Sequence, residues 1–149
     1  MMTAGLAEAV PGGLARQEIL VTVHPLQWEA ARILVSATTS TILERGRGLI
    51  RGDVVTSDEP LLAGTEIGGV LAAVNPYLPE ESSNRPSETG GVETEFMSLI
   101  PLTVAEGSWL AASPEADLGA RQVRLLELLD DESVDLLDVR RTSVLTPLP

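Results

Sequence analysis

The chain has 149 residues, no cysteine and a formal net charge of −12 at pH 7. This length suits one domain, which would bury about two thirds of the surface of the unfolded chain, and the missing cysteines exclude disulfides and thiolate metal sites. Because binding to phosphate groups needs clustered cations, the negative charge argues against nucleic acids and anionic membranes as partners.

Residues 1–16 are predicted to form a flexible N-terminal segment, because Met1 to Ala15 is rich in small residues and shows little periodicity. This segment lacks the basic region and long apolar core of a secretory signal, and no stretch of the chain reaches the roughly 20 apolar residues of a membrane span. We therefore expect a cytoplasmic protein with no membrane partner. Residues 17–146 are predicted to form the domain, and residues 147–149 a tail.

The first predicted elements are a strand and a long helix. Glu18 to Val23 is apolar and β-branched, and the strand should stop before Pro25, since the residue before a proline avoids the α region. Leu26 to Arg45 has apolar residues every three or four positions, which predicts an amphipathic helix, and Gly46 supplies a left-handed stop. Trp28 adjoins the helix face that must pack on the sheet, so we expect it to be buried.

The middle of the chain alternates between irregular and apolar stretches. Residues 46–64 carry glycine, aspartate and proline at turn positions and are expected to be irregular. Thr65 to Val74 is a predicted buried strand, in which Gly68 and Gly69 indicate a bulge or a close backbone approach. Asn75 to Gly91 is rich in proline, glutamate, serine and glycine, and is expected to be a mobile loop.

The stretch around Pro101 combines a strand, a stop and a helix start. Phe96 to Ile100 is an apolar run of strand length, and we expect it to end at Pro101, because proline cannot donate a ladder hydrogen bond. Thr103 stands three residues before Glu106, which is the spacing of a capping box at the start of a helix. Because the chain holds only two tryptophans, one tyrosine and one phenylalanine, we expect Phe96 to be enclosed in the core.

The last third predicts one more helix and a final strand. After the break at Ser113–Pro114, Glu115 to Leu129 has the apolar spacing of a helix, and Asp138 to Leu145 is a candidate strand. Strands separated by helices predict an α/β or α+β domain, here a single domain with a mixed sheet packed against helices.

None of the candidate catalytic groups forms a recognisable motif. His24 is the only histidine, and it adjoins no nucleophile motif, so we expect it to be structural or solvent-facing. One histidine without cysteine makes a poor zinc site. Residues 46–52 lack the Lys-Ser/Thr of a P-loop and are predicted to form turns. Glu93 and Glu95 could lie on one face of a strand, but two isolated carboxylates are too common to indicate a glycosidase. We therefore expect no enzymatic activity, no cofactor and no metal.

An acidic stretch follows the last helix. It consists of Asp130, Asp131, Glu132 and Asp135. No EF-hand spacing is present, which leaves a solvated acidic loop and a surface for a basic partner as the two interpretations. Asp138 is expected to form a local ion pair with Arg140 or Arg141 that steadies the final strand.

Several short motifs occur in a characteristic order between Val23 and Leu145. They are Trp28, Gly52-Asp53, Glu59-Pro60-Leu61, Gly64-Thr65, the run from Glu95 to Thr103 with Glu106, and Leu137-Asp138-Val139-Arg140-Arg141. In this order and spacing they resemble the Suppressor-of-fused domain family. The chain departs from the family pattern in two places: most of the part before the first strand is missing, and Ser113–Pro114 interrupts a helix that usually runs into a glycine-containing turn.

The resemblance implies protein binding. Animal members are cytoplasmic and nuclear regulators that bind a transcription-factor peptide beside their sheet, and many bacterial members look like immunity proteins of toxin systems. It predicts a non-enzymatic binding domain, an immunity or regulatory protein whose partner is a basic toxin domain or peptide. The alternatives are a small hydrolase or ligand-binding domain, and a structural subunit of a larger assembly. The partner should contact the four acids above, or the strand end at Val74 and Asn75.

Overall fold

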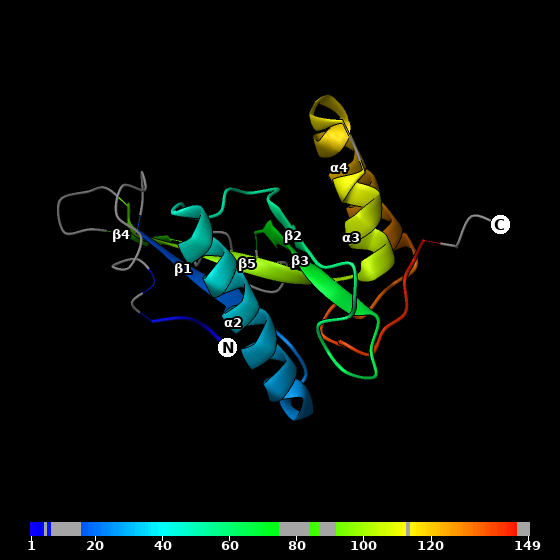
Figure 1. Ribbon diagram of the computed structural model, residues 1–149, viewed down its shortest axis with the longest axis horizontal. Coiled ribbons are helices and arrows are strands. Elements are labelled where there is room, and N and C mark those ends of the chain that lie inside the picture. The colour runs from blue at the N-terminus through cyan, green and yellow to red at the C-terminus, as the bar shows by residue number, and fades with distance from the viewer. Residues whose placement is uncertain (5, 7–15, 75–83, 87–91, 113, 146–149) are drawn as a thin grey trace.

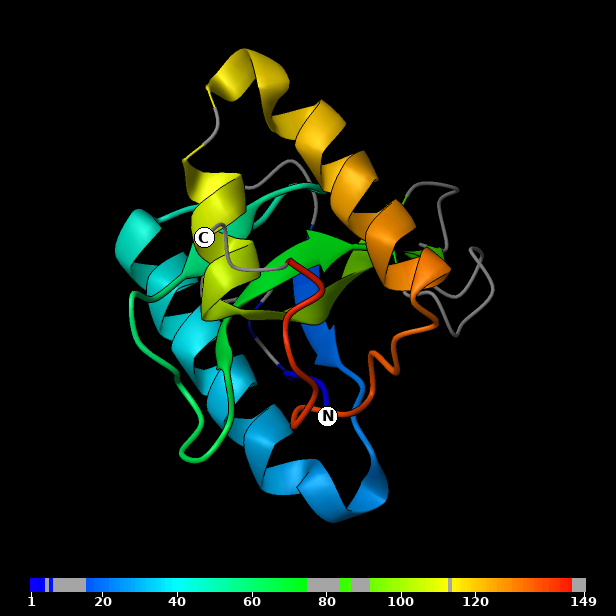
Figure 2. The same cartoon turned by 90° about the vertical axis from the view of Figure 1, so that its right-hand side faces the viewer.

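The computed structural model describes residues 1–4, 6, 16–74, 84–86, 92–112 and 114–145. The strands are β1 (Arg16–Val21), β2 (Val54–Thr56), β3 (Ile67–Ala73), β4 (Asn84–Pro86) and β5 (Val92–Thr103). The helices are the short 3₁₀ helix η1 (Pro25–Gln27), α2 (Trp28–Arg45), α3 (Val104–Ala111) and α4 (Glu115–Asp131). One mixed sheet has helices on both of its faces, so the fold is α+β (Figures 1 and 2).

Strand β5 is the centre of the sheet because it is long enough to pair with three other strands. The order is β1-β5-β3-β2, and β4 pairs with β5 off this path. Strand β1 runs parallel to β5, from Arg16 opposite Thr94 to Val21 opposite Leu99. Strands β3 and β4 both run antiparallel to β5. The mixed sheet expected from the sequence is therefore present.

Alternating side chains of the sheet feed two separate cores, as the period of two in a strand requires. On one face, Met97 and Leu99 of β5 pack in a cluster with α2. On the other face, Ile100 and Leu102 pack in a cluster with α3 and α4. Helix α2 thus covers one face of the sheet, while α3 and α4 cover the other (Figure 1).

Helix α2 confirms the long helix predicted from the sequence, and Gly46 ends it in the left-handed conformation at φ 64°. The expectation for Trp28 was wrong, because 60% of this residue is exposed. Its spacing from Ala31 and Val35 places it on the buried stripe of the helix. However, the first turn of α2 projects past the sheet (Figures 1 and 2), so the sheet does not cover this part of the helix.

The expected strand stop at Pro101 was also wrong, since β5 continues to Thr103 and pairs Pro101 with Val70. The Pro101 carbonyl accepts a hydrogen bond from Nη2 of Arg141 at 2.9 Å. The nitrogen and carbonyl of one strand residue face the same side, and β1 ends at Val21, before it reaches this position. Proline is tolerated here because no neighbouring strand needs its missing N–H. Phe96 is half-buried rather than enclosed.

Glycines shape the pairing of β3 as expected. The register shifts between Ile67 and Gly69, which is the predicted irregularity. A Cβ atom added at Gly68 would lie 2.4 Å from the Val104 side chain, and one at Gly69 would lie 2.5 Å from the Val55 carbonyl. Both positions therefore require close backbone approach. Strand β2, which pairs with β3, lies inside the stretch expected to be irregular.

The two ends of the described chain differ from their predictions. Met1 and Thr3 form backbone hydrogen bonds along the outer side of β1, so these first residues are attached to the sheet and cover its edge. Residues 138–145 form turns and bends instead of the expected final strand.

Most of the expected 75–91 loop lies outside the described residues. No helix in the described part of the chain is both long and apolar enough to cross a membrane.

Candidate functional site

The start of α3 organises the junction between the sheet and the end of the chain. Thr103 is the N-cap residue, and its hydroxyl accepts from the Glu106 backbone N–H at 3.3 Å. The Glu106 carboxylate in turn accepts from the Thr103 N–H at 2.9 Å. This is the capping box predicted from the spacing of the two residues. The box also turns the Glu106 carboxylate inward, where the residue is fully buried.

Arg141 neutralises this buried carboxylate. Its Nη1 and Nη2 atoms donate to the two Glu106 oxygens at 2.8 and 2.6 Å, in the bidentate geometry that suits a guanidinium group. Val144 donates its backbone N–H to the same carboxylate at 3.2 Å. Burial alone would raise the pKa of Glu106, but the hydrogen bonds and charge of Arg141, with the N–H groups of Thr103 and Val144, lower the pKa instead.

Residues 132–145, which we call the C-terminal strap, are also fastened to the turn before α2. Gln27 donates from Nε2 to the Asp138 carboxylate, and its Oε1 accepts from the Val139 backbone N–H at 3.1 Å. One side chain therefore bridges η1 and the strap, and Val139 is buried against the α2 core. In Figure 2 the strap runs from the end of α4 down to the start of α2.

The ion pair expected between Asp138 and Arg140 or Arg141 is replaced by other contacts. Asp138 accepts from the Gln27 side chain and from the backbone N–H of Arg140, while the Arg141 side chain is committed to Glu106. The hydrogen bond from the Gln27 side chain is the main reason why the pKa of Asp138 lies below its usual value. The sequence offered no local signal for the pairing of Glu106 and Arg141, because 35 positions separate them.

His24 and Asp135 form a second, exposed link between the strap and the α2 turn. The His24 Nε2 atom lies 2.7 Å from the Asp135 carboxylate, with 43% and 52% of the two side chains exposed. Asp135 also accepts from the Leu137 backbone N–H. The hydrogen bond with His24 lowers the pKa of Asp135, and the hydrogen bond from the Leu137 N–H lowers it further. The histidine is therefore partly exposed to solvent and bonded to the strap, in agreement with the structural or solvent-facing position expected from the sequence.

The predicted partner-binding residues lie in different regions. Asp130, Asp131 and Glu132 lie exposed at the end of α4, and within the described residues no ion pair joins them to an arginine. Asp135 continues this acidic surface onto the strap. Val74 is half-buried just after the end of β3. The strap contacts the other end of that strand, where the Ser143 backbone N–H donates to the Glu66 carboxylate. Asn75 lies outside the described residues.

The glycine-rich loop before β2 is a turn and holds no phosphate-binding cradle. Its Arg47 pairs with Asp53 at 2.8 Å, and Gly52 takes a φ of 93°. Gln122 of α4 donates to the Gly52 carbonyl, so this loop is packed against α4. Among the described residues, no group of three or more histidine, aspartate or glutamate side chains is placed to hold a metal ion.

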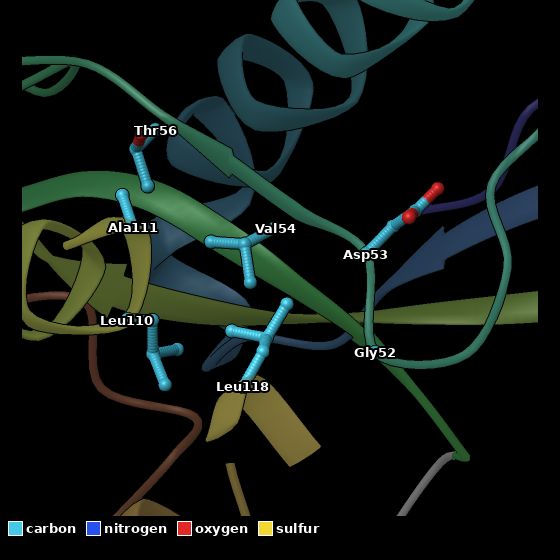
Figure 3. A pocket seen from close by; sticks show the side chains of 7 residues that line it. All are labelled: Gly52, Asp53, Val54, Thr56, Leu110, Ala111 and Leu118. Carbon is cyan, nitrogen blue, oxygen red and sulfur yellow. The ribbon is translucent and has the colours of Figure 1, made fainter. Parts of the chain in front are cut away.

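A pocket of about 300 Å³ lies between β2, α3 and α4. Figure 3 shows the side chains of Val54, Leu110 and Leu118 pointing toward one another, while the Asp53 carboxylate points away from them. Apolar side chains therefore line one side of the pocket, and the carboxylate of Asp53, the titratable residue in its lining, points away from them. The apolar side of this pocket offers room for an apolar group of a small ligand.

Comparisons with known proteins bear on the fold. No family model matches the chain, and no curated protein matches it either. Among solved structures, the chain is similar to a protein from Neisseria gonorrhoeae FA 1090 described as a SUFU (suppressor of fused protein) homolog. The likeness has a TM-score of 0.63 and 17% sequence identity, and it covers 99% of this chain and 70% of the other. The chain therefore has a Suppressor-of-fused-like fold, as the sequence resemblance predicted.

Proposed function

We propose that this protein is a non-enzymatic, cytoplasmic protein-binding domain of the Suppressor-of-fused type that acts as a toxin-immunity or regulatory protein. The observation that carries the proposal is the exposed acidic surface formed by Asp130, Asp131, Glu132 and Asp135. Surface charge of one sign attracts a partner of the opposite sign and speeds its association. In a chain with a net charge of −12, this surface suits a basic toxin domain or a basic peptide.

The surroundings of the single histidine support a binding role over a hydrolytic one. A Ser-His or Cys-His mechanism needs a nucleophile within hydrogen-bonding reach of the ring. In the part of the chain that the structure describes, the His24 ring bonds to Asp135, and no hydroxyl group is bonded to it. The fold likeness adds support for the Suppressor-of-fused type.

The test measures association rates after capture of a partner from the native host. A variant with Asp130→Asn, Asp131→Asn, Glu132→Gln and Asp135→Asn should associate more slowly, with a smaller change in dissociation. The wild-type rate should fall as salt rises, because exposed charges are screened over about 10 Å at 0.1 M. Surface plasmon resonance at two salt concentrations measures both effects.

A matched control removes four exposed acids elsewhere, namely Glu44, Asp58, Glu59 and Asp117. Both variants change the net charge equally, so a slower rate in the first variant alone assigns the effect to the surface at the end of α4. Equal rates in both variants and in the wild type would reject the acidic surface. The strand end at Val74 and Asn75 would then be the remaining candidate.

A ligand-binding domain is the second candidate, and the pocket between β2, α3 and α4 favours it. A small apolar ligand should perturb the methyl NMR signals of Val54, Leu110 and Leu118, which point toward one another in that pocket. The substitution Ala111→Phe would fill the pocket from its α3 side. Perturbations that survive this substitution would show that the ligand binds elsewhere.

A further inference from the structure

Two apolar side chains stand out from the surface at the start of α2. Leu26 is 97% exposed and Trp28 is 60% exposed. We call this pair the apolar tip. Leaving large apolar side chains in water forgoes the favourable free energy of burying them. A pair of them together on one turn indicates a contact that the described part of the chain does not itself satisfy.

The turn that carries the apolar tip is held firmly from behind. Gln27, which lies between the two exposed residues, points inward and bonds both Asp138 and the Val139 backbone. One residue before η1, the His24 backbone N–H donates to the Leu137 carbonyl at 3.1 Å. A rigidly held aromatic and aliphatic pair loses little conformational freedom on binding, which is a property of interface hot spots.

The strap joins the turn that carries the apolar tip to the acidic surface. His24 bonds Asp135 at 2.7 Å, and the strap leads from Asp135 back to Glu132 at the end of α4 (Figure 2). The charges closest to the tip in sequence, Glu29 and Arg32, form an ion pair with each other. On the side of the strap, Asp135 and Asp138 outnumber the exposed Arg140, and Asp130, Asp131 and Glu132 follow at the end of α4, so the net charge on this side is acidic.

We propose that the apolar tip is the anchor of the partner-binding surface, and that the partner offers an apolar groove bordered by basic residues. This inference rests on the proposed protein-binding function and deepens it. The acids would steer the basic rim of the groove during encounter, and burial of Leu26 and Trp28 would slow dissociation.

Two other occupants of the tip fit the charges less well. A second copy of the chain would bring two acidic surfaces together, since a symmetric dimer buries the same patch on both subunits. An anionic lipid surface would repel the same acids. A basic protein surface is the occupant whose charge complements Asp130, Asp131, Glu132 and Asp135.

The test uses a synthetic amphipathic helical peptide of leucine and lysine as a defined basic and apolar probe. In the variant Trp109→Phe, Trp28 is the only tryptophan, so its fluorescence reports directly on the tip. We expect the peptide to shift the Trp28 emission to the blue, and Leu26→Ser to weaken binding about tenfold or more, the loss typical of a hot-spot residue. The control is Val123→Ser, because Val123 is 58% exposed on α4, and it should bind as the parent does.

The acid variant separates this inference from the function on which it rests. Weaker binding in both the acid variant and Leu26→Ser supports the apolar tip as the anchor. If only the acid variant binds more weakly, the acidic surface stands and the anchor is overturned. Unchanged affinity in both overturns both proposals. A blue shift with phosphatidylcholine vesicles, or self-association by light scattering that Leu26→Ser abolishes, would assign the tip to lipid or to a second copy and overturn the inference.

Discussion

Two ion pairs join the C-terminal strap to earlier parts of the chain, and they differ mainly in their exposure to water. Glu106 and Arg141 form a pair with 0% and 6% of their side chains exposed, whereas about half of each side chain is exposed in the pair of His24 and Asp135. In both cases a residue of the strap reaches an earlier part of the chain. The comparison shows that burial, rather than the presence of opposite charges, distinguishes a structural ion pair from one that lies at the surface.

Burial decides the energetics of the two pairs. A buried ion pair gives little net stability over an apolar pair, but removing one partner leaves an uncompensated charge away from water. An exposed pair exchanges its contact for water with little loss. The strap should therefore depend on Arg141, while the surface at His24 and Asp135 tolerates change.

The largest expected effect follows from Arg141→Met. This change leaves the Glu106 carboxylate buried without its cation and removes the donor to the Pro101 carbonyl. We expect a loss of about 3–5 kcal/mol in the free energy of unfolding, measured by chemical denaturation. The neighbouring and exposed Arg140 provides the control, and Arg140→Met should have little effect. Equal stability of the two variants would contradict the assignment of Arg141 as the structural cation.

Acid should act on the same junction. The folded pKa of Glu106 is lowered, so its contribution to stability is fully present above the ordinary glutamate pKa of about 4.3 and is lost as the pH falls through the folded value. In Glu106→Gln this part of the pH dependence disappears. Denaturation between about pH 5 and pH 3 should therefore show a shallower loss of stability than in the wild type. An unchanged slope would mean that Glu106 does not ionise with a lowered pKa.

A smaller effect is expected for Thr103→Ala, which removes the hydroxyl that caps α3. The expected cost is about 1 kcal/mol, measured as a lower denaturation midpoint. Ser108 lies exposed on the same helix, so Ser108→Ala is a matched change without a cap. If both variants unfold at the wild-type midpoint, the cap contributes nothing to stability.

The smallest effect belongs to the exposed pair. Asp135→Asn removes the charge that faces His24, but water can solvate both groups after the change. We expect a denaturation midpoint that is indistinguishable from that of Asp130→Asn, a substitution at an exposed acid on α4. A clear loss of stability in Asp135→Asn alone would show that this pair, like the buried one, holds the strap.

Local sequence signals predicted those features that depend on neighbouring residues. The α3 cap depends on a spacing of three residues, the end of α2 on one glycine, and the register shift of β3 on the Gly68–Gly69 pair. Each of these is decided by backbone geometry over a few positions, which is why the sequence resolves it. The order of such motifs was also sufficient to predict a Suppressor-of-fused-like fold, which the structural likeness confirms.

The candidate site was predicted less completely. The sequence identified the acids at the end of α4, and their role in binding stays a prediction. It did not identify the apolar tip, because Trp28 has the spacing of a buried helix residue and only the position of α2 relative to the sheet exposes it. An exposed Leu26 beside an inward-pointing Gln27 also depends on the strap, which lies more than 100 residues away in the chain.

Sequence alone therefore determined the long helix, the α3 cap and the glycine-dependent turns, because these follow from short-range sterics and hydrogen bonding. The fold type came from the resemblance carried by the order of the motifs. Tertiary structure decided which residues meet. It let β5 continue through Pro101, because β1 ends before that position and Arg141 occupies the space. It joined Glu106 to Arg141 across 35 positions, and it left Phe96 half-buried and Trp28 in water. Such contacts depend on where whole elements end relative to one another, which no local pattern of residues encodes.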